Sequence, residues 1–209
     1  MKGSIPWTKR ELRLFRRLSS PIRIQHYLNA IAYDPIYATS SPRWVIKDRK
    51  ANCFEGALFA AAALRMIGHE PLVVDIESWN DDDHVLAVFK KRGHWGAVAK
   101  SNYTVLRYRE PVYRSLRELV MSYFDVYFNP LGQKTMRSYS LPLNLRQFDR
   151  RNWMTTDEDI GYIGDKLNQI RHFRVLTPAM VRSLSLADKD IVKAGLMGAK
   201  PEGLFRPKR

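Results

Sequence analysis

The sequence predicts an α+β protein in which a central buried helix packs on a small antiparallel sheet. The first observation is an apolar run at residues 57–64, which follows a polar segment and leaves no polar face for solvent. The second is a series of apolar segments, 72–76, 84–91 and 94–102, separated by short polar turns. Helical periodicity before and after these segments predicts further helices around this unit.

The chain begins with two predicted helices. Apolar residues recur at helical spacing over residues 8–18. A second helix is expected to begin with Ser20 as its cap and Pro21 in the first helical position, and to end near Ile31. Residues 33–50 contain two prolines and are interpreted as a surface loop that forms a wall of the candidate site.

The central helix is predicted to run from Asn52 to Ile67 and to end at Gly68, which suits the left-handed position after a helix. The only cysteine of the chain, Cys53, then lies in the first turn. Free N–H groups and the positive end of the helix dipole stabilise a thiolate there, and the thiolate is the reactive form. From this helix alone, a small core side chain is an equally good interpretation of Cys53, because unpaired cysteine is commonly buried.

The last two predicted strands form a hairpin around Arg92 and Gly93. In a two-residue hairpin the numbers of paired residues have a constant sum, which places Ser101 opposite His84. A loop longer by one residue places Asn102 there instead. In both registers a neutral hydrogen-bonding side chain faces the histidine.

The second half of the chain contains fewer clear signals. A helix is predicted from Pro111 to residue 128, because apolar and aromatic residues recur at spacings of three and four. Residues 134–140 and 143–148 are expected to be short strands or extended segments. Thr156 is expected to cap a further helix over residues 157–170.

Helical pieces are also expected at residues 177–184 and 187–196. Residues 1–150 are therefore interpreted as the core with its N-terminal helices. Residues 151–209 are interpreted as a helical C-terminal extension packed on the same domain.

Cys53 and His84 have the chemistry of a nucleophile and its base. A cysteine nucleophile needs an imidazole to accept its proton, and the imidazole needs a third residue to fix its tautomer and orientation. Asn102 or Ser101 is the predicted third residue. Alternatively, His84 caps the acidic turn that precedes it, and Asn102 ends its strand by bonding its own backbone. The other four histidines, His26, His69, His94 and His172, are interpreted as structural or surface residues.

The oxyanion of an acyl-transfer intermediate requires hydrogen-bond donors close to the thiol. The backbone N–H of Cys53 is one candidate, and a second is expected from the chain around Trp44 or Asn52. Trp44 is a candidate wall of the substrate cleft, with a core anchor as the alternative.

These residues carry a family resemblance. The segments 52–57, 83–85 and 95–102 make the chain similar to the transglutaminase-like superfamily of papain-like cysteine hydrolases, over about residues 20–128. In that family Cys, His, and Asp or Asn follow in this order on a helix and two neighbouring strands, so the resemblance implies this fold and a Cys53-His84-Asn102 triad. Family members usually place an aspartate shortly after the tryptophan of the third strand, where this chain has Ser101 and Asn102. Residues 100–111 resemble, more specifically, a bacterial branch to which no substrate can be attached.

Composition limits the class of protein. The chain of 209 residues has a formal charge of +14, which could attract a nucleic acid or an acidic partner. One cysteine excludes an internal disulfide, and no Cys/His spacing indicates zinc, so no metal and no cofactor is expected. There is no apolar stretch of membrane-spanning length and no secretory signal, so we expect no membrane association and a cytoplasmic location.

Together these features predict a cysteine-dependent acyl-transfer enzyme that acts on a peptide bond or a glutamine carboxamide of a peptide or protein. Hydrolysis is expected rather than transamidation, because water is always present as an acceptor. The alternative is a non-catalytic protein of the same fold that recruits a nucleic acid or an acidic protein through its basic surface.

Overall fold

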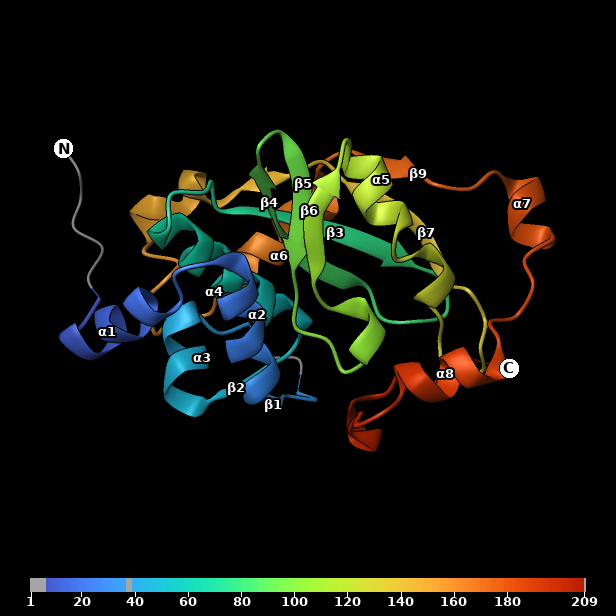
Figure 1. The fold of residues 1–209 in the computed structure, drawn as a ribbon, viewed down its shortest axis with the longest axis horizontal. Coiled ribbons are helices and arrows are strands. Elements are labelled where there is room, and N and C mark those ends of the chain that lie inside the picture. The colour runs from blue at the N-terminus through green and yellow to red at the C-terminus, as the bar shows by residue number, and fades with distance from the viewer. Residues whose placement is uncertain (1–6, 37–38, 209) are drawn as a thin grey trace.

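The computed structural model describes residues 7–36 and 39–208 and has an α+β fold (Figure 1). The helices are α1 (Lys9–Arg17), α2 (Pro21–Ala30), α3 (Pro42–Asp48), α4 (Cys53–Met66), α5 (Leu116–Met121), α6 (Tyr162–Gln169), α7 (Pro178–Arg182) and α8 (Lys189–Gly195). The strands are β1 (Ala32–Tyr33), β2 (Lys50–Ala51), β3 (Leu72–Ser78), β4 (His84–Lys91), β5 (His94–Val98), β6 (Arg109–Tyr113), β7 (Met136–Ser140), β8 (Leu143–Asn144) and β9 (His172–Arg174). Short 3₁₀ helices are η1 (Thr104–Leu106), η2 (Phe124–Val126), η3 (Leu145–Arg151) and η4 (Pro201–Gly203).

The main sheet is antiparallel throughout and larger than the small sheet predicted. Its strands lie in the order β6-β5-β4-β3-β7-β9, and β8 also pairs with β3. Strand β9 comes from the predicted helical extension, so that part of the chain also contributes to the sheet. The two short strands β1 and β2 pair in parallel beside the start of α4.

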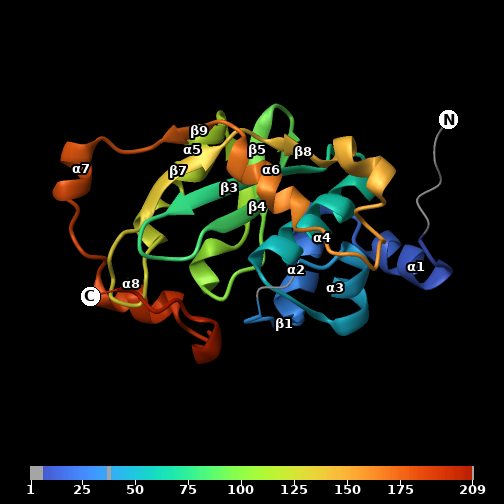
Figure 2. The same cartoon turned by 180° about the vertical axis from the view of Figure 1, so that it is seen from behind.

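Helices cover both faces of this sheet. Val73 and Val85 point to one side and belong to the core that contains α4 and α6, whereas Val74 and Leu86 belong to the core that contains α5. This alternation is the two-residue period of a strand buried on both faces. Figure 1 shows α5 in front of the sheet, and Figure 2 shows α6 in front of the opposite face.

The central helix α4 forms as predicted. The side chain of Asn52 accepts a hydrogen bond from the Glu55 N–H, and the Glu55 carboxylate accepts one from the Asn52 N–H, so the two residues form a capping box. Residues 55–64 are all buried. Gly68 follows the helix with φ of +93°, as its predicted left-handed position requires.

The hairpin between β4 and β5 also has the predicted turn and register. Arg92 and Gly93 both have positive φ, and Lys91 pairs with His94. The ladder ends at the pair Ala87–Val98, however, because β5 stops at Val98. The predicted pairing of Ser101 or Asn102 with His84 is therefore wrong, and on its other side His84 pairs with Ile76 of β3.

Four element predictions are wrong. Of the segment 143–148, predicted as a strand or extended chain, only Leu143–Asn144 is a strand, and η3 begins at Leu145. The predicted loop at 33–50 contains α3, whose Ser-Pro start repeats the signal that was used for α2. The predicted helix from Pro111 begins instead as the edge strand β6, where a proline is tolerated because one side needs no donor. Thr156 does not cap a helix, because α6 begins only at Tyr162 with Gly161 as its N-cap.

Among the described residues, none of the helices combines the length and apolar character needed to cross a membrane.

Candidate active site at the start of helix α4

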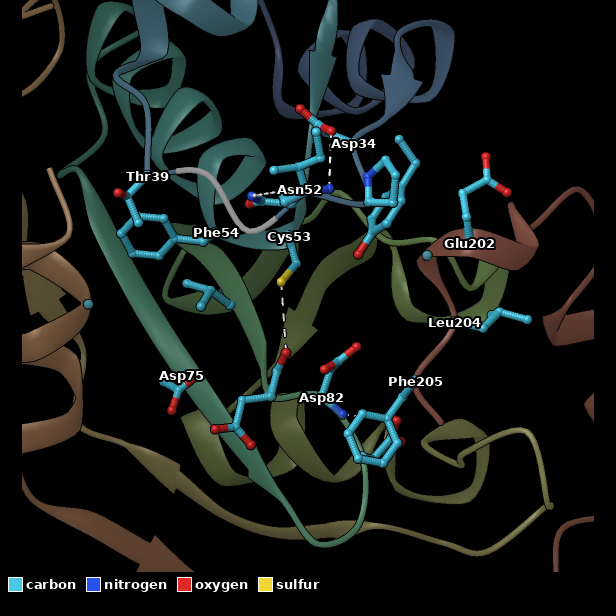
Figure 3. Close-up of a pocket in the computed structure, with 18 of the residues that line it drawn as sticks. Asp34, Thr39, Asn52, Cys53, Phe54, Asp75, Asp82, Glu202, Leu204 and Phe205 are labelled. Atoms are coloured by element: carbon cyan, nitrogen blue, oxygen red, sulfur yellow. Dashed lines mark hydrogen bonds between the residues drawn. The ribbon is translucent and has the colours of Figure 1, made fainter. Parts of the chain in front are cut away.

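Cys53 is the first residue of α4 and borders a cavity of about 740 Å³. Figure 3 shows its thiol pointing from the helix into this cavity, with Asp75 on one side and Asp82 beside Phe205 on the other. The capping box of Asn52 fixes the helix start, so the position of the sulfur is set by the local sequence.

His84 lies close to the same place, at the first residue of β4. A small hollow of about 40 Å³ is lined by both Cys53 and His84, and it shares Cys53 and Gly203 with the larger cavity. Ser101 and Asn102 also line this hollow. The structure therefore gathers all four predicted catalytic residues around one space.

The partner of His84 is a main-chain group. The Nε2 atom of the buried imidazole lies 2.9 Å from the carbonyl oxygen of Leu106 in η1. A carbonyl only accepts hydrogen bonds, so Nε2 carries the proton and Nδ1 of the neutral ring is left with a lone pair. Leu106 thus provides the orientation that was predicted for Asn102 or Ser101.

Asn102 and Ser101 are engaged elsewhere. The Asn102 amide makes two hydrogen bonds with the backbone of Lys200, and the Ser101 hydroxyl accepts one from the Tyr103 N–H. Neither forms a hydrogen bond with His84. The signal that could have revealed this is the shortness of β5, because beyond its end the ladder no longer determines which residues face each other.

Cys53 and His84 are not joined by a hydrogen bond. The thiol donates instead to the carbonyl of Asp83 at 3.7 Å. His84 has the strand parity of Leu86, and its ring packs edge-on against Tyr127, so it points toward the α5 side of the sheet, whereas α4 covers the other side. The two groups share the hollow at the end of the strand but must approach each other before a proton can pass between them.

The surroundings keep both groups neutral. The pKa of the Cys53 thiol is raised to about 12, chiefly by burial. The Val85 N–H opposes this shift, and the carboxylates of Asp82 and Asp75 add to it by smaller amounts. Burial lowers the pKa of His84 to about 4, in spite of its bond to Leu106. The dipole of α4 therefore does not produce a thiolate in this state.

Of the two residues predicted to lie near the second oxyanion donor, Asn52 borders the thiol cavity and Trp44 does not. Asn52 lines the large cavity, but its backbone N–H is bonded to Glu55 and its side-chain amide donates to the Ile36 carbonyl. Trp44 lines a separate surface hollow with Asp157, and the Lys47 ammonium lies 3.6 Å from its ring centre. The prediction that Trp44 forms a wall of the thiol cleft is wrong, because α3 holds it away from both cavities that Cys53 borders.

Acidic side chains were missed as part of this site. The large cavity is lined by Asp34, Asp75, Asp81, Asp82 and Asp83. Burial raises the pKa of Asp75 and of Asp81, each to about 7. Shifted pKa values in a cavity are typical of functional sites. The run of three aspartates before His84 was the signal in the sequence.

The C-terminal segment was missed as well. Residues 202–206 line the large cavity, and Gly203 lines the hollow between Cys53 and His84. This segment lies about 120 residues along the chain from the Asp81–Asp83 turn, and no pattern in the sequence indicates that it returns to the site.

Within the part of the chain that the structure describes, no three thiol, imidazole or carboxylate side chains are placed to hold one metal ion. No family model matches the chain, and no curated protein matches its sequence.

Proposed function

We propose that the chain is a cysteine-dependent acyl-transfer enzyme with a papain-like core of the transglutaminase-like type, acting on the amide of a peptide or protein. The observation that carries this proposal is the hydrogen bond from His84 Nε2 to the Leu106 carbonyl. It leaves Nδ1 as the base in a hollow that Cys53 also lines, at the start of a buried helix.

The reaction follows from these groups. As Cys53 Sγ bonds to the amide carbon, its proton passes to Nδ1 of His84. The carbon–nitrogen bond then breaks, and the amine leaves with that proton. Water adds to the thioester carbon, gives one proton to the imidazole, and the acid is released as that proton returns to the sulfur.

In this proposal the arrangement with a neutral thiol and a neutral imidazole is a resting state of the enzyme. Burial is the largest cause of both shifted pKa values, and residues 202–206 contribute to the enclosure of the thiol. Movement of this segment admits water and brings the pKa values of Cys53 and His84 back toward each other, as proton transfer requires.

We expect Cys53 of the resting protein to react slowly with iodoacetamide, about 10²-fold more slowly than free cysteine near pH 8. The high pKa of the thiol leaves little thiolate, and the greater nucleophilicity of a more basic thiolate offsets only part of this deficit. Mass spectrometry of the alkylated residue against time measures the rate. A rate equal to or above that of free cysteine would contradict the resting state described here.

Acylation by p-nitrophenyl acetate tests the catalytic proposal. We expect stoichiometric acetylation of Cys53 in the unchanged chain. In His84→Gln we expect the acetylation rate to fall by a factor of at least about 10², because glutamine can still donate to the Leu106 carbonyl but provides no base. Cys53→Ala should not be acetylated at this position. If folded His84→Gln is acetylated at Cys53 as fast as the unchanged chain, His84 is not the base and the proposal fails.

A non-catalytic binding function is the second candidate, and helix α1 favours it. Its residues Lys9, Arg10, Arg13, Arg16 and Arg17 are all exposed. A row of cations on one helix attracts a polyanion, with affinity that falls steeply as salt is added.

We expect Arg13→Glu with Arg16→Glu to weaken binding of a generic single-stranded RNA by about tenfold and to reduce its salt dependence, if this surface binds nucleic acid. Fluorescence anisotropy at two salt concentrations measures both quantities. Lys189→Glu with Lys193→Glu, both on α8, is the matched control, because it changes the net charge by the same amount at another place. Equal weakening by the two pairs would remove α1 as a specific binding surface.

A further inference from the structure

Residues 200–208, called the tail segment below, cross the entrance of the candidate active site. After α8 the chain passes through η4 and returns toward the turn between β3 and β4 (Figures 1 and 2). Beyond Leu204 the segment has no regular secondary structure. Residues 202–206 of this segment therefore form part of the wall of the cavity beside Cys53.

Two asparagines hold the backbone of the tail segment. The Asn102 amide donates to the Lys200 carbonyl and accepts from its N–H, both at 2.9 Å. The Asn80 amide does the same with Lys208, at 3.0 and 2.8 Å. Each amide satisfies both main-chain groups of one residue, so this recognition requires a peptide backbone and no particular side chain.

Between these two contacts the tail segment packs closely against Tyr33 and Asn102. A Cβ atom added at Gly203 would lie 2.9 Å from the Tyr33 ring and 3.1 Å from the Asn102 amide. Phe205 and Arg206 then line the large cavity, and Figure 3 shows Phe205 beside Asp82. The middle of the tail segment thus forms part of the cavity wall, while the two asparagines hold the ends of the segment.

The charges of the two surfaces are complementary. The tail segment carries three basic residues and one acidic residue, whereas the body of the protein lines the cavity with the five aspartates named above. Asp34 already pairs with Lys50, and Asp75 and Asp81, whose pKa values are raised to about 7, carry their negative charges mainly above that pH. This acidic lining contrasts with the net charge of +14 for the whole chain. Charge complementarity of this kind favours a cationic ligand over other peptides.

The inner hollow also holds an unused polar group. Tyr103 lines it and is 8% exposed, and its buried hydroxyl has no hydrogen-bond partner among the described residues. A buried hydroxyl without a partner is unfavourable, so a ligand group that reached the hollow would gain this hydrogen bond.

We propose that the cleft between α4 and the Asp81–Asp83 turn binds an extended basic peptide from another chain, and that the tail segment is its resident competitor. Asn102 and Asn80 hold the backbone of the peptide, and the aspartates select its cationic side chains. The inference rests on the proposed function only where it makes this peptide the substrate of Cys53.

The test displaces the tail segment without changing the cleft. In the full chain, Gly203→Leu introduces a side chain where Tyr33 and Asn102 leave no room for a Cβ. A fluorescent peptide with the sequence of residues 199–208 is then added, and its anisotropy is measured. A tail tethered in cis has an effective concentration in the millimolar range, so we expect at least about tenfold tighter binding to Gly203→Leu than to the unchanged chain.

Matched variants separate the alternatives. Lys200→Ala keeps the backbone groups that Asn102 holds and should bind the peptide as weakly as the unchanged chain. Phe205→Asp, which places a carboxylate beside Asp82, is a second way to release the tail segment should Gly203→Leu fold poorly. Adding Asn102→Ala to either displaced variant should reduce peptide binding about tenfold.

The inference is overturned if neither displaced variant binds the peptide, or if a peptide with glutamate in place of its basic residues binds equally well. Binding is also measured after Cys53→Ala is added to each displaced variant. Peptide binding by these double variants, together with failure of the acylation test, would reject the proposed enzyme and keep the peptide site. Acylation without peptide binding would keep the proposed enzyme and reject the peptide site.

Discussion

Replacing Gly56 by alanine is expected to lower the free energy of unfolding by about 3 kcal/mol. A Cβ at this position would overlap the Cβ of Lys100, so one of the two segments must move. Lys100 is buried and its ammonium donates to the carbonyls of Leu28 and Ile31 at the end of α2. Movement of Lys100 would therefore weaken two charge-assisted hydrogen bonds as well as the packing of α4.

The same substitution at Gly164 is the control. There the added Cβ would meet only the Phe54 ring, at an ordinary contact distance of 3.7 Å, and the residue lies inside α6. Alanine favours a helix over glycine by up to about 1 kcal/mol, so Gly164→Ala should be neutral or stabilising. Urea unfolding of both variants gives the comparison. A loss below about 1 kcal/mol in Gly56→Ala would show that α4 and the chain at Lys100 can separate easily.

Asp81→Asn is expected to reduce the loss of stability that the protein suffers as the pH rises. The raised pKa of Asp81 means that the native state keeps a proton that the unfolded chain has lost between about pH 4 and pH 7. The native state binds more protons in this window, so the free energy of unfolding falls with rising pH. At one pKa unit per 1.36 kcal/mol, this carboxyl contributes about 3 kcal/mol of the change between pH 5 and pH 8.5.

The variant should show a change smaller by that amount, measured by urea unfolding at both pH values. Asp81 accepts hydrogen bonds from Thr135 and from the Asp82 N–H, and asparagine can keep only one of them. The resulting loss of stability is the same at both pH values, so it cancels when the two are compared. Asp149→Asn is the matched control. Hydrogen bonds from Arg65 lower the pKa of Asp149, so its contribution is complete above about pH 4 and changes little in this range. An unchanged pH dependence in Asp81→Asn would mean that Asp81 is ionised in the native protein near pH 5.

Local signals predicted the elements that depend on local interactions. The helix α4, its capping box and its terminal Gly68 follow from a few adjacent residues, and the turn at Arg92 and Gly93 sets the register of β4 and β5. The Ser-Pro start of α3 carried the same kind of signal and was overlooked because the surrounding prolines suggested a loop. Strand β6 was assigned as helix because its apolar residues fitted a helical spacing, while its position at the sheet edge depends on pairing with β5.

The site was predictable only to the extent that it follows from single elements. Cys53 at a helix start and His84 at a strand start are properties of one element each. The side of the sheet to which His84 points depends on strand parity relative to the two cores, which could have been counted from Val85 and Leu86. The contacts of Asn102 with Lys200 and of Asn80 with Lys208 join residues about 100 positions or more apart, and no local pattern contains them.

The bond from His84 to Leu106 has a consequence for comparisons between sequences. A main-chain carbonyl is present whatever side chain stands at position 106, so this orienting group cannot be removed by substitution and leaves no characteristic letter in an alignment. A motif search that requires a carboxylate or amide as third member would pass over every chain built in this way. The hydrogen bond depends instead on the backbone path of η1. Insertions or deletions between Ser101 and Leu106 are therefore the changes that would separate the imidazole from its acceptor.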